Sequence, residues 1–183
     1  LKKQPGVDPE HLAAMGYCFG GGVVLHMARM GLDLDGVASF HGSLATNVPA
    51  KKGKVKASVL VCHGSDDQFV TAEQIATFKQ EMKDAEVDLV FETYRGARHS
   101  FTNPDADRLA EELGLPIGYS AEADEASWTE LEWFLARIFA EEGWSGARVG
   151  MGLTRMALPS KIRKTRPLNR NHNRALNRLG FGS

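Results

Sequence analysis

Cys18 lies at the centre of a glycine-rich segment that could present a nucleophile to a substrate. Residues 16–22 read Gly-Tyr-Cys-Phe-Gly-Gly-Gly, follow an apolar run and precede a helical pattern. This is the context of the G-x-S-x-G nucleophile elbow, with cysteine in place of serine. The glycines two positions before and after the nucleophile, Gly16 and Gly20, leave room for a sharp strand-to-helix turn and for close packing of the neighbouring backbone.

The same position would stabilise a negatively charged sulfur. The first turn of a helix offers free N–H groups and the positive end of the helix dipole, and both favour a thiolate. The backbone N–H of Phe19 would then serve as one oxyanion-hole donor. Taken alone, the segment is also compatible with a buried strand-end cysteine. A phosphate-binding glycine loop is disfavoured, because neither the Gly-Lys-Ser/Thr ending nor the G-x-G-x-x-G spacing is present.

Asp66, Asp67 and His99 follow two later apolar runs and could supply an acid and a base. Separately, either aspartate is typical of a solvated turn or a helix cap, and a lone loop histidine is typical of a surface. Together with Cys18, they follow the order nucleophile, acid, histidine found in α/β-hydrolases. Sites in open α/β sheets are built at the carboxyl ends of the strands. The residues therefore predict a catalytic triad and leave either aspartate as its acid.

Strands and helices alternate in the part of the chain that would position these residues. Apolar runs predict strands and helical periodicity predicts helices. The expected strands are 11–17, 36–40, 58–62 and 87–94, and the expected helices are 23–30, 71–84, 106–113 and 121–140. Thr71 is a predicted helix N-cap. The residues of the last helix predicted to face inward are Trp128, Leu131, Leu135 and Ile138. The alternation predicts an α/β fold, with a mostly parallel sheet flanked by helices.

The three motifs together resemble those of the dienelactone hydrolase family, within the α/β-hydrolase superfamily. The resemblance rests on the elbow at 16–21, on Gly-x-x-Asp-x-Phe-Val at 64–70 and on Gly-Ala-Arg-His-Ser-Phe at 96–101. It covers roughly residues 5–140, including a closing region at 115–128. It implies that the chain holds a partial α/β-hydrolase fold.

The resemblance also implies roles for single residues. It selects Asp67 over Asp66 and implies a triad of Cys18, Asp67 and His99. In the lactone-cleaving members, an arginine four residues after the catalytic histidine helps to hold the substrate carboxylate, and this chain has Asn103 there. The dienelactone substrate itself is therefore not implied.

The predicted function is hydrolysis of a small-molecule ester or lactone through a thioester acyl-enzyme. No cofactor is implied, and no spacing of His, Cys and acidic residues predicts a metal site. A second hypothesis is a catalytically inactive fragment of such a hydrolase, or an interaction module whose open strand edges pair with another chain. The sequence does not indicate an oligomeric state.

The other cysteine and the other histidines outside the last part of the chain are predicted to be structural. Cys62 lies within a strand and is expected in the core. His41 and His63 follow strand ends and could line the site, although a structural role is the favoured interpretation. His11 and His26 are expected at the surface.

Charge divides the chain into two parts. All 23 acidic residues lie within the first 142 positions, whereas residues 148–183 carry nine of the 22 basic residues. We predict a hydrolase domain at 1–142 and a basic, disordered tail at 143–183. The tail is interpreted as an appended segment without a role rather than as a nucleic-acid-binding arm. Because the chain starts at Leu1 and such domains run to about 200–250 residues, about the first hundred are expected to be missing.

Two further features bear on the environment of the protein. No apolar run approaches eighteen residues, so we expect no membrane partner. The two cysteines are too few for a disulfide framework, which favours a reducing compartment and predicts a cytoplasmic protein.

Overall fold

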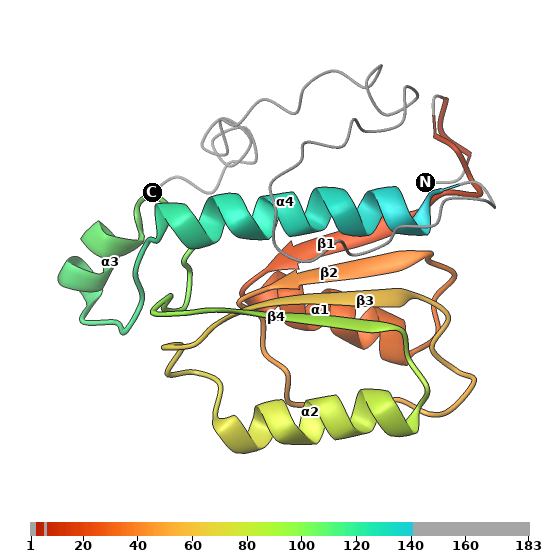
Figure 1. The fold of residues 1–183 in the computed structure, drawn as a ribbon, viewed down its shortest axis with the longest axis horizontal. Helices are drawn as coiled ribbons and strands as arrows, with labels where there is room; N and C mark the ends of the chain where they lie inside the picture. Colours follow the sequence, from red (N-terminus) through yellow and green to blue (C-terminus); the bar gives the residue numbers. More distant parts are fainter. Residues whose placement is uncertain (1–2, 6, 141–183) are drawn as a thin grey trace, which may run out of the picture. The chain divides into compact units, whose positions relative to one another are not determined.

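The computed structural model describes residues 3–5 and 7–140, so the predicted basic tail lies outside the described part of the chain. Within it, three of the four strands are followed directly by a helix (Figure 1). In chain order the elements are β1 (Ala13–Tyr17), α1 (Phe19–Arg29), β2 (Gly36–Phe40), β3 (Ser58–Gly64), α2 (Ala72–Asp84), β4 (Leu89–Tyr94), α3 (Ala106–Leu113) and α4 (Ala121–Ile138). Each predicted strand and helix is present, with shifted ends in several cases.

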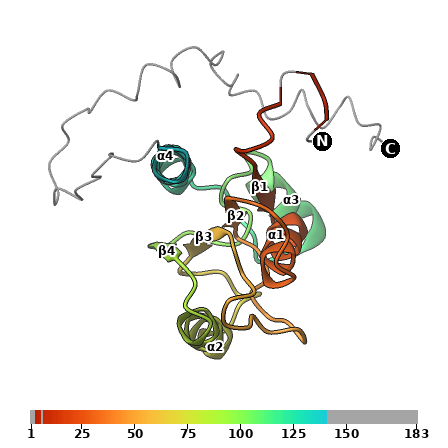
Figure 2. The same cartoon turned by 90° about the vertical axis from the view of Figure 1, so that its right-hand side faces the viewer.

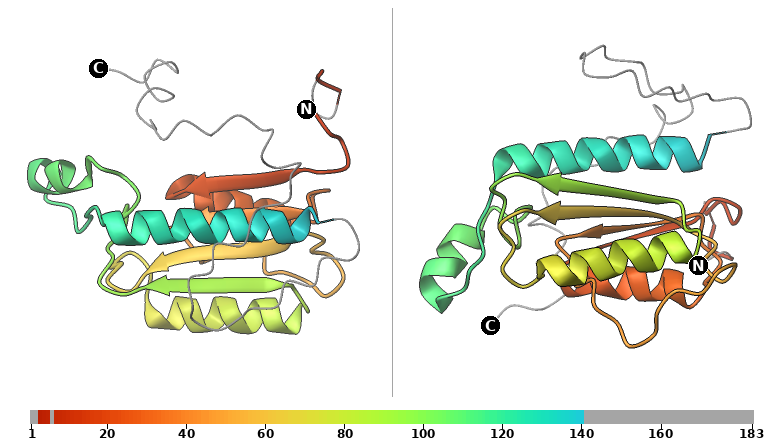
Figure 3. Two further views of the ribbon diagram at one scale, coloured as in Figure 1. Left: turned by 45° about the horizontal axis from the view of Figure 1, so that its top comes forward. Right: turned by 60° about the horizontal axis from the view of Figure 1, so that its bottom comes forward.

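The four strands form one sheet in the order β1-β2-β3-β4, and all of its strand pairs are parallel. Tyr17, Phe40 and Cys62 lie side by side across the first three strands. All four strands therefore end at the same edge of the sheet, where α3 also lies (Figures 1 and 3). This confirms the predicted parallel sheet flanked by helices.

Helices cover both faces of the sheet. α1 and α2 lie on one face and α4 on the other, as the end-on view shows (Figure 2). On the α1/α2 face, neighbouring strands contribute Val37, Val59 and Leu89, which share one register row. The next row, Ala38, Leu60 and Val90, turns to α4. Because both faces are covered, every residue of β2 and every residue of β3 after Ser58 is buried.

Helix α4 packs with a wider face than the sequence predicted. Leu131 is buried, whereas Trp128, Leu135 and Ile138 are partly buried against the same cluster. Phe134, which the prediction left out, is also buried there. A Cβ at Gly36 would lie 2.5 Å from Ile138 Cδ1. The helix therefore packs directly over the first residue of β2, where a larger residue would displace the Ile138 and Phe134 side chains.

The starts of α1 and α2 are fixed in different ways. α1 begins at Phe19, four residues before its predicted start, because the glycines at 20–22 pack as helix rather than interrupting it. α2 follows Thr71, the predicted cap. The Thr71 hydroxyl accepts the Gln74 N–H, and the Gln74 side chain accepts the Thr71 N–H. This reciprocal capping box satisfies two N–H groups at the helix start.

A buried ion pair joins α1 to α2. Arg29 Nε donates to Glu81 Oε1 at 2.8 Å and Arg29 Nη2 donates to Glu81 Oε2 at 2.9 Å, with the two side chains 2% and 9% exposed. Nη2 also donates to the Leu44 carbonyl at 2.9 Å, and the Ala50 N–H donates to Glu81 Oε1 at 2.6 Å. The pair therefore anchors the loop between β2 and β3. It was not predicted from the sequence.

The helices agree with the absence of a long apolar run from the sequence. No helix in the described part of the chain is both long and apolar enough to cross a membrane.

Candidate active site

Cys18 occupies the turn between β1 and α1 in a strained backbone conformation. Its φ and ψ are 51° and −120°, and it is the N-cap of α1. A positive φ is rare for a residue with a side chain and persists only where the surroundings enforce it. The cysteine is exposed to solvent. The residue predicted as a nucleophile therefore lies at an accessible strand-to-helix turn.

The glycines of this turn have unequal roles. A Cβ at Gly16 would lie 2.2 Å from the Gly20 carbonyl oxygen, so the predicted need for glycine before the nucleophile is confirmed. A Cβ at Gly20 would meet nothing within 4 Å, so the predicted need for glycine at that position is wrong. The close approach is made instead by Gly21, where a Cβ would lie 2.6 Å from Ser39 Oγ. Gly21 thus brings α1 against β2.

The structure brings the three predicted catalytic residues together. His99 Nε2 lies 3.1 Å from Cys18 Sγ, and His99 Nδ1 lies 2.9 Å from Asp67 Oδ2. The Asp67 side chain is 0% exposed, and its other oxygen accepts the Phe69 N–H at 2.9 Å. Asp66 is exposed and accepts the Ser65 hydroxyl instead. The aspartate beside the histidine is therefore Asp67.

The acid loop and the histidine loop are hydrogen-bonded to each other. The Asp66 N–H donates to the Ala97 carbonyl at 2.9 Å, and the Gly96 N–H donates to Ser65 Oγ at 2.8 Å. A Cβ at Gly64 would lie 2.3 Å from the Ala97 oxygen. This glycine therefore allows the two loops to approach closely enough for Asp67 and His99 to bond.

The segment before α4 supports the other side of the histidine loop. His99 and Ile117 form an isolated parallel bridge, and the Gly118 N–H donates to the His99 carbonyl at 3.1 Å. The Ser120 N–H donates to the Phe101 carbonyl at 3.1 Å. The loop that carries His99 is thus held by backbone hydrogen bonds from the acid loop on one side and from the segment before α4 on the other.

The electrostatics of the pair favour its charged forms. Burial acts to raise the pKa of Asp67, but hydrogen bonds from His99 and the Phe69 N–H outweigh it, and the net pKa is lowered. Burial acts to lower the pKa of His99, but its hydrogen bonds to Asp67 and Cys18 outweigh it, and the net pKa is raised. The site therefore stabilises a protonated His99 beside an ionised Asp67.

Two exposed phenylalanines adjoin the predicted catalytic residues. Phe19 follows Cys18 directly and is 82% exposed, and Phe69 is 50% exposed with its ring 4.8 Å from the ring of His99. As the first residue of α1, Phe19 has a backbone N–H without an intrahelical partner. That N–H is the predicted oxyanion donor, and this role stays a prediction.

His41 was expected to be structural, and it lies in contact with two of the three residues. It follows β2 and is buried, and the Cys18 N–H donates to its Nδ1 at 3.2 Å. Its ring centroid is 5.1 Å from that of His99. Sequence reasoning noted its strand-end position but had no motif to connect it with Cys18. That position, at the edge where the site is built, was the available signal.

The second cysteine and three other histidines can be compared with their expected places. His63, expected to follow a strand end, lies within β3, which runs on to Gly64. Cys62 is fully buried, and burial raises the pKa of its thiol to about 12. His63 is buried, with its ring 5.9 Å from that of Phe91 on β4. His11 and His26 are exposed.

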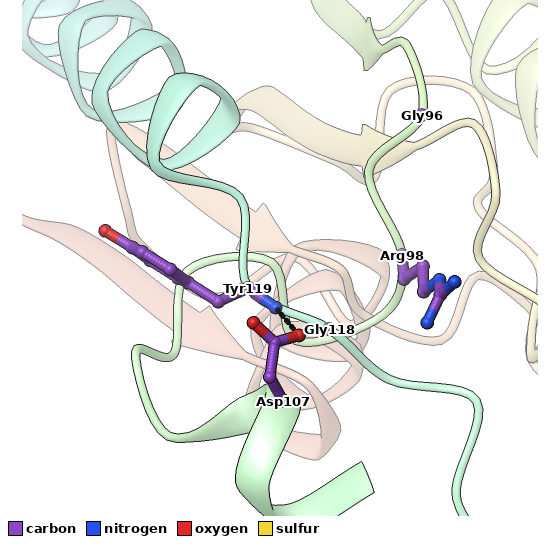
Figure 4. A pocket seen from close by; sticks show the side chains of 5 residues that line it. All are labelled: Gly96, Arg98, Asp107, Gly118 and Tyr119. Carbon is purple, nitrogen blue, oxygen red and sulfur yellow. Dashed lines mark hydrogen bonds between the residues drawn. The ribbon is translucent and has the colours of Figure 1, made fainter.

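A separate small pocket lies at the same edge of the sheet (Figure 4). Its volume is about 210 Å³, and none of the three predicted catalytic residues lines it. The lining residues are Gly96, Arg98, Asp107, Gly118 and Tyr119. The Tyr119 N–H donates to Asp107 Oδ1 at 3.1 Å, and the Arg98 and Tyr119 side chains point away from each other. The pocket therefore reflects packing between the histidine loop and α3.

Two further features limit the chemistry of the site. Within residues 3–5 and 7–140, no three His, Cys, Asp or Glu side chains are grouped so as to hold a metal ion. Asn103, at the position where the resemblance leads one to expect arginine, uses its side-chain oxygen to accept the Asp105 N–H at 3.1 Å. It thereby shapes the turn before α3.

Comparison with known proteins gives one family and several solved structures. The model of the dienelactone hydrolase family matches residues 1–139. An uncharacterized protein of Caenorhabditis elegans, K02A2.1, is 36% identical over 143 residues, which are 76% of this chain and 88% of that protein.

Two solved structures are similar in sequence as well as in fold. The dienelactone hydrolase-like promiscuous phosphotriesterase P91, from metagenomic libraries, is 37% identical with a TM-score of 0.68, and 76% of this chain matches 57% of it. A structure called m3DLH is 37% identical with a TM-score of 0.69, and 75% of this chain matches 56% of it. This chain thus spans somewhat more than half the length of both structures.

More distant structures agree in fold. A dienelactone hydrolase of Klebsiella pneumoniae, described as putative, is 20% identical with a TM-score of 0.58. The metagenomic α/β-hydrolase MGS-M1 is 18% identical with a TM-score of 0.54. The parallel sheet and its helices are therefore part of an α/β-hydrolase fold, as the sequence predicted.

Proposed function

Because the chain belongs to the dienelactone hydrolase family, we propose that it carries an ester-hydrolysing site with Cys18 as nucleophile, His99 as general base and Asp67 as the residue that orients the base. The observation that carries this proposal is the continuous chain of contacts from Asp67 Oδ2 to His99 Nδ1 at 2.9 Å and from His99 Nε2 to Cys18 Sγ at 3.1 Å. These contacts support the roles of nucleophile, base and orienting acid.

The first half of the reaction forms an acyl-enzyme. With the thiol proton on His99 Nε2, the Cys18 thiolate adds to the ester carbonyl carbon, and the carbonyl oxygen becomes an oxyanion. The Phe19 N–H donates to that oxyanion at the start of α1. The C–O bond to the leaving alcohol then breaks, the leaving oxygen takes the proton from His99 Nε2, and a thioester on Cys18 remains.

The second half releases the acid. Neutral His99 accepts a proton from water through Nε2 while the water oxygen adds to the thioester carbon. The C–S bond breaks, the carboxylic acid departs, and the thiolate and the protonated imidazole are restored. Asp67 stabilises the imidazolium and keeps the Nδ1 proton directed at its carboxylate throughout.

The surroundings favour neutral, apolar esters over substrates that carry a carboxylate. Two exposed phenylalanines offer apolar surface: Phe19 directly follows Cys18, and Phe69 packs on the ring of His99. Asn103 replaces the arginine that the resemblance associates with the substrate carboxylate, and its side chain is engaged in a turn. Acetate or butyrate esters of an aryl alcohol are therefore better first substrates than dienelactones.

Hydrolysis of p-nitrophenyl butyrate by the chain and its cysteine variants tests the proposal. Cys18→Ala should lower kcat/KM on the order of 10³-fold or more, because the covalent route is lost. Cys62→Ala serves as the matched control and should retain activity. Mass spectrometry under acid quench should show an acyl group on Cys18. Full activity in Cys18→Ala would overturn the assignment.

The competing hypothesis of an inactive fragment or interaction module gives a different result in the same assay. It expects neither turnover nor an acyl group in any variant. Selective alkylation of Cys18 over Cys62 by iodoacetamide, lost in His99→Ala, would still favour an assembled site. Equal, slow alkylation of both thiols would favour the inactive fragment.

The domain boundary belongs to the same proposal. We assign the hydrolase unit to residues 1–142 and give the basic segment 143–183 no part in catalysis. A chain that ends at residue 142 should keep its p-nitrophenyl butyrate activity to within about twofold, since every residue of the mechanism lies before that point. A loss of activity on truncation would contradict this boundary.

A further inference from the structure

His41 occupies a position that the mechanism above does not use. It is the first residue after β2, and its backbone N–H donates to the Cys62 carbonyl at 2.8 Å. Its φ is +39°, in the region that disfavours residues with side chains. The residue is 3% exposed. A strained, buried histidine at the functional edge of a sheet calls for a physical reason.

The hydrogen bonds of the His41 ring determine its protonation. The Cys18 N–H donates to Nδ1 at 3.2 Å while also donating to the Phe40 carbonyl at 3.0 Å. Because a backbone N–H is only a donor, Nδ1 must be unprotonated. The ring proton of the neutral imidazole is then on Nε2, which donates to Thr102 Oγ1 at 2.9 Å. The ring therefore links the nucleophile turn to the loop that carries His99.

Ring packing fixes the orientation of both histidines. The rings of His41 and His99 meet at a centroid distance of 5.1 Å and an interplanar angle of 63°. Phe101 contacts the His41 ring at 5.2 Å and 81°, and Tyr17 contacts it at 5.9 Å. The His99 ring thus packs against two rings, those of His41 and Phe69. Its freedom to rotate away from Cys18 is limited accordingly.

His41 stays neutral while His99 takes up protons. Burial lowers the pKa of His41 to about 4, with the charge of His99 acting in the same direction and that of Asp67 opposing it. The pKa of His99 is raised by its own hydrogen bonds. Near neutral pH the two adjacent rings therefore never carry charge together, and the His99 imidazolium meets no repulsion from this side.

Backbone strain is concentrated around the same contacts. In the described part of the chain, four residues other than glycine have positive φ: Cys18, His41, Glu86 and Ser100. Three of them belong to this site, as the nucleophile, the residue bonded to it and the residue after the base. Such conformations persist when neighbouring interactions hold them, and the bond from Cys18 N–H to His41 joins two of them directly.

We propose that His41 is a positioning residue, which holds the Cys18 turn through Nδ1 and the His99 loop through Nε2 and Thr102. This inference rests on the proposed function, since it assigns a role relative to Cys18 and His99. It predicts that the geometry between the thiol and the imidazole degrades when the His41 bridge is removed, although no atom of His41 meets the substrate.

The test compares His41→Phe, His41→Asn and a control, His63→Asn, in p-nitrophenyl butyrate hydrolysis and in Cys18 alkylation. His41→Phe keeps a ring but removes both bonds, and kcat should fall on the order of 100-fold with KM little changed, since misplacement of reacting groups by about 1 Å costs this much. His41→Asn keeps an acceptor near the Nδ1 position and tolerates positive φ. It should recover about tenfold of that loss.

The control is the other buried histidine at a strand end. His63 is the second-last residue of β3, and its ring lies 5.9 Å from that of Phe91. In the described part of the chain, no side-chain hydrogen bond joins it to Cys18, Asp67 or His99. His63→Asn should leave the Cys18 alkylation rate unchanged, whereas His41→Phe should slow it in parallel with kcat. Equal effects of the two histidine variants on alkylation would overturn the proposal.

Thr102 gives a milder pair of variants that does not depend on the folding of His41→Phe. Thr102→Val removes the acceptor of the Nε2 proton and should lower kcat by about three- to tenfold, the value of one hydrogen bond. Thr102→Ser keeps the hydroxyl and should restore the rate. If Thr102→Val and Thr102→Ser act alike, the bridge has no role. If Cys18→Ala also keeps activity, the proposed function fails as well, which distinguishes the two failures.

Discussion

Two buried acid–base pairs of this protein look alike in their distances but differ in what surrounds them. Arg29 and Glu81 meet at 2.8 and 2.9 Å, and His99 and Asp67 meet at 2.9 Å. The other hydrogen bonds of the Arg29–Glu81 pair join it to backbone groups at Leu44 and Ala50. That pair is closed, since its bonds all end on groups that cannot react.

The His99–Asp67 pair is open at one end. Asp67 is satisfied by His99 and the Phe69 N–H, but the second nitrogen of His99 meets an exposed thiol. The comparison teaches that burial and ion pairing do not by themselves mark a functional site. What separates the two pairs is a titratable group with a reactive, accessible neighbour.

Asp67→Asn is expected to have the largest effect of the variants that test the difference between the two pairs. The amide would hold His99 in the wrong tautomer, so kcat for p-nitrophenyl butyrate should fall on the order of 10³- to 10⁴-fold. The matched variant on the closed pair, Glu81→Gln, should keep kcat within a few-fold in the folded protein. Steady-state kinetics at 25 °C measures both. Similar kcat values for the two variants would mean that the pairs do not differ in function.

Glu81→Gln should have its effect on stability instead. It leaves the Arg29 guanidinium buried without a counter-charge, and such a change costs about 3–5 kcal/mol of unfolding free energy. Urea unfolding followed by circular dichroism measures the difference. The double variant Arg29→Met/Glu81→Leu should recover most of the loss, because well-packed apolar residues replace buried pairs at little cost. A double variant as unstable as the single one would contradict this account.

The open pair should also make stability depend on pH. The pKa of Asp67 is lowered, so its contribution is present above the unfolded value near 4 and is lost as pH falls through the folded value. The pKa of His99 is raised, so its contribution is present below about 6.5 and is lost as pH rises through the folded value. The stability advantage of the wild type over Asp67→Asn should peak between about pH 4 and 6.5. An advantage that does not change with pH would show that the charges are uncoupled.

A third polar interaction, the capping box at the exposed start of α2, is expected to contribute least to the free energy of unfolding. Thr71→Ala removes the capping box of the helix that carries Glu81, and it should cost about 1 kcal/mol of unfolding free energy. Thr71→Ser should retain the stability. Urea unfolding of both variants at pH 7 is the measurement, and kcat should not change. A loss as large as that of Glu81→Gln would show that α2 depends more on its cap than on the ion pair.

Features that depend on residues close together in the sequence could be predicted from it. The elbow around Cys18 and the strand-end motifs at Asp67 and His99 predicted three residues that the structure brings within hydrogen-bond distance. Their catalytic role stays a prediction. Thr71 and Gln74 are only three residues apart in the capping box. The sequence predicted Thr71 as the N-cap, but Gln74 was not included in the prediction.

Features that depend on distant residues were not visible. Arg29 and Glu81 are 52 residues apart, and nothing near either one indicates the other. The early start of α1 depends on the packing of Gly21 against Ser39. This tertiary contact outweighs the low helix propensity of glycine. His41 was noted only as a strand-end residue, because its contacts come from separate parts of the chain: the β1–α1 region, β3 and the loop after β4.

The order of the strands has a consequence for the folding of the chain. Each strand pairs with the one that follows it in the sequence, so the sheet can grow by adding one neighbour at a time. Cys18 precedes β2, whereas His99 follows β4 and lies 81 residues later. A chain that has folded only through β3 would lack the contact between His99 and Cys18. The onset of rapid, selective Cys18 alkylation during refolding would therefore time the joining of the last strand.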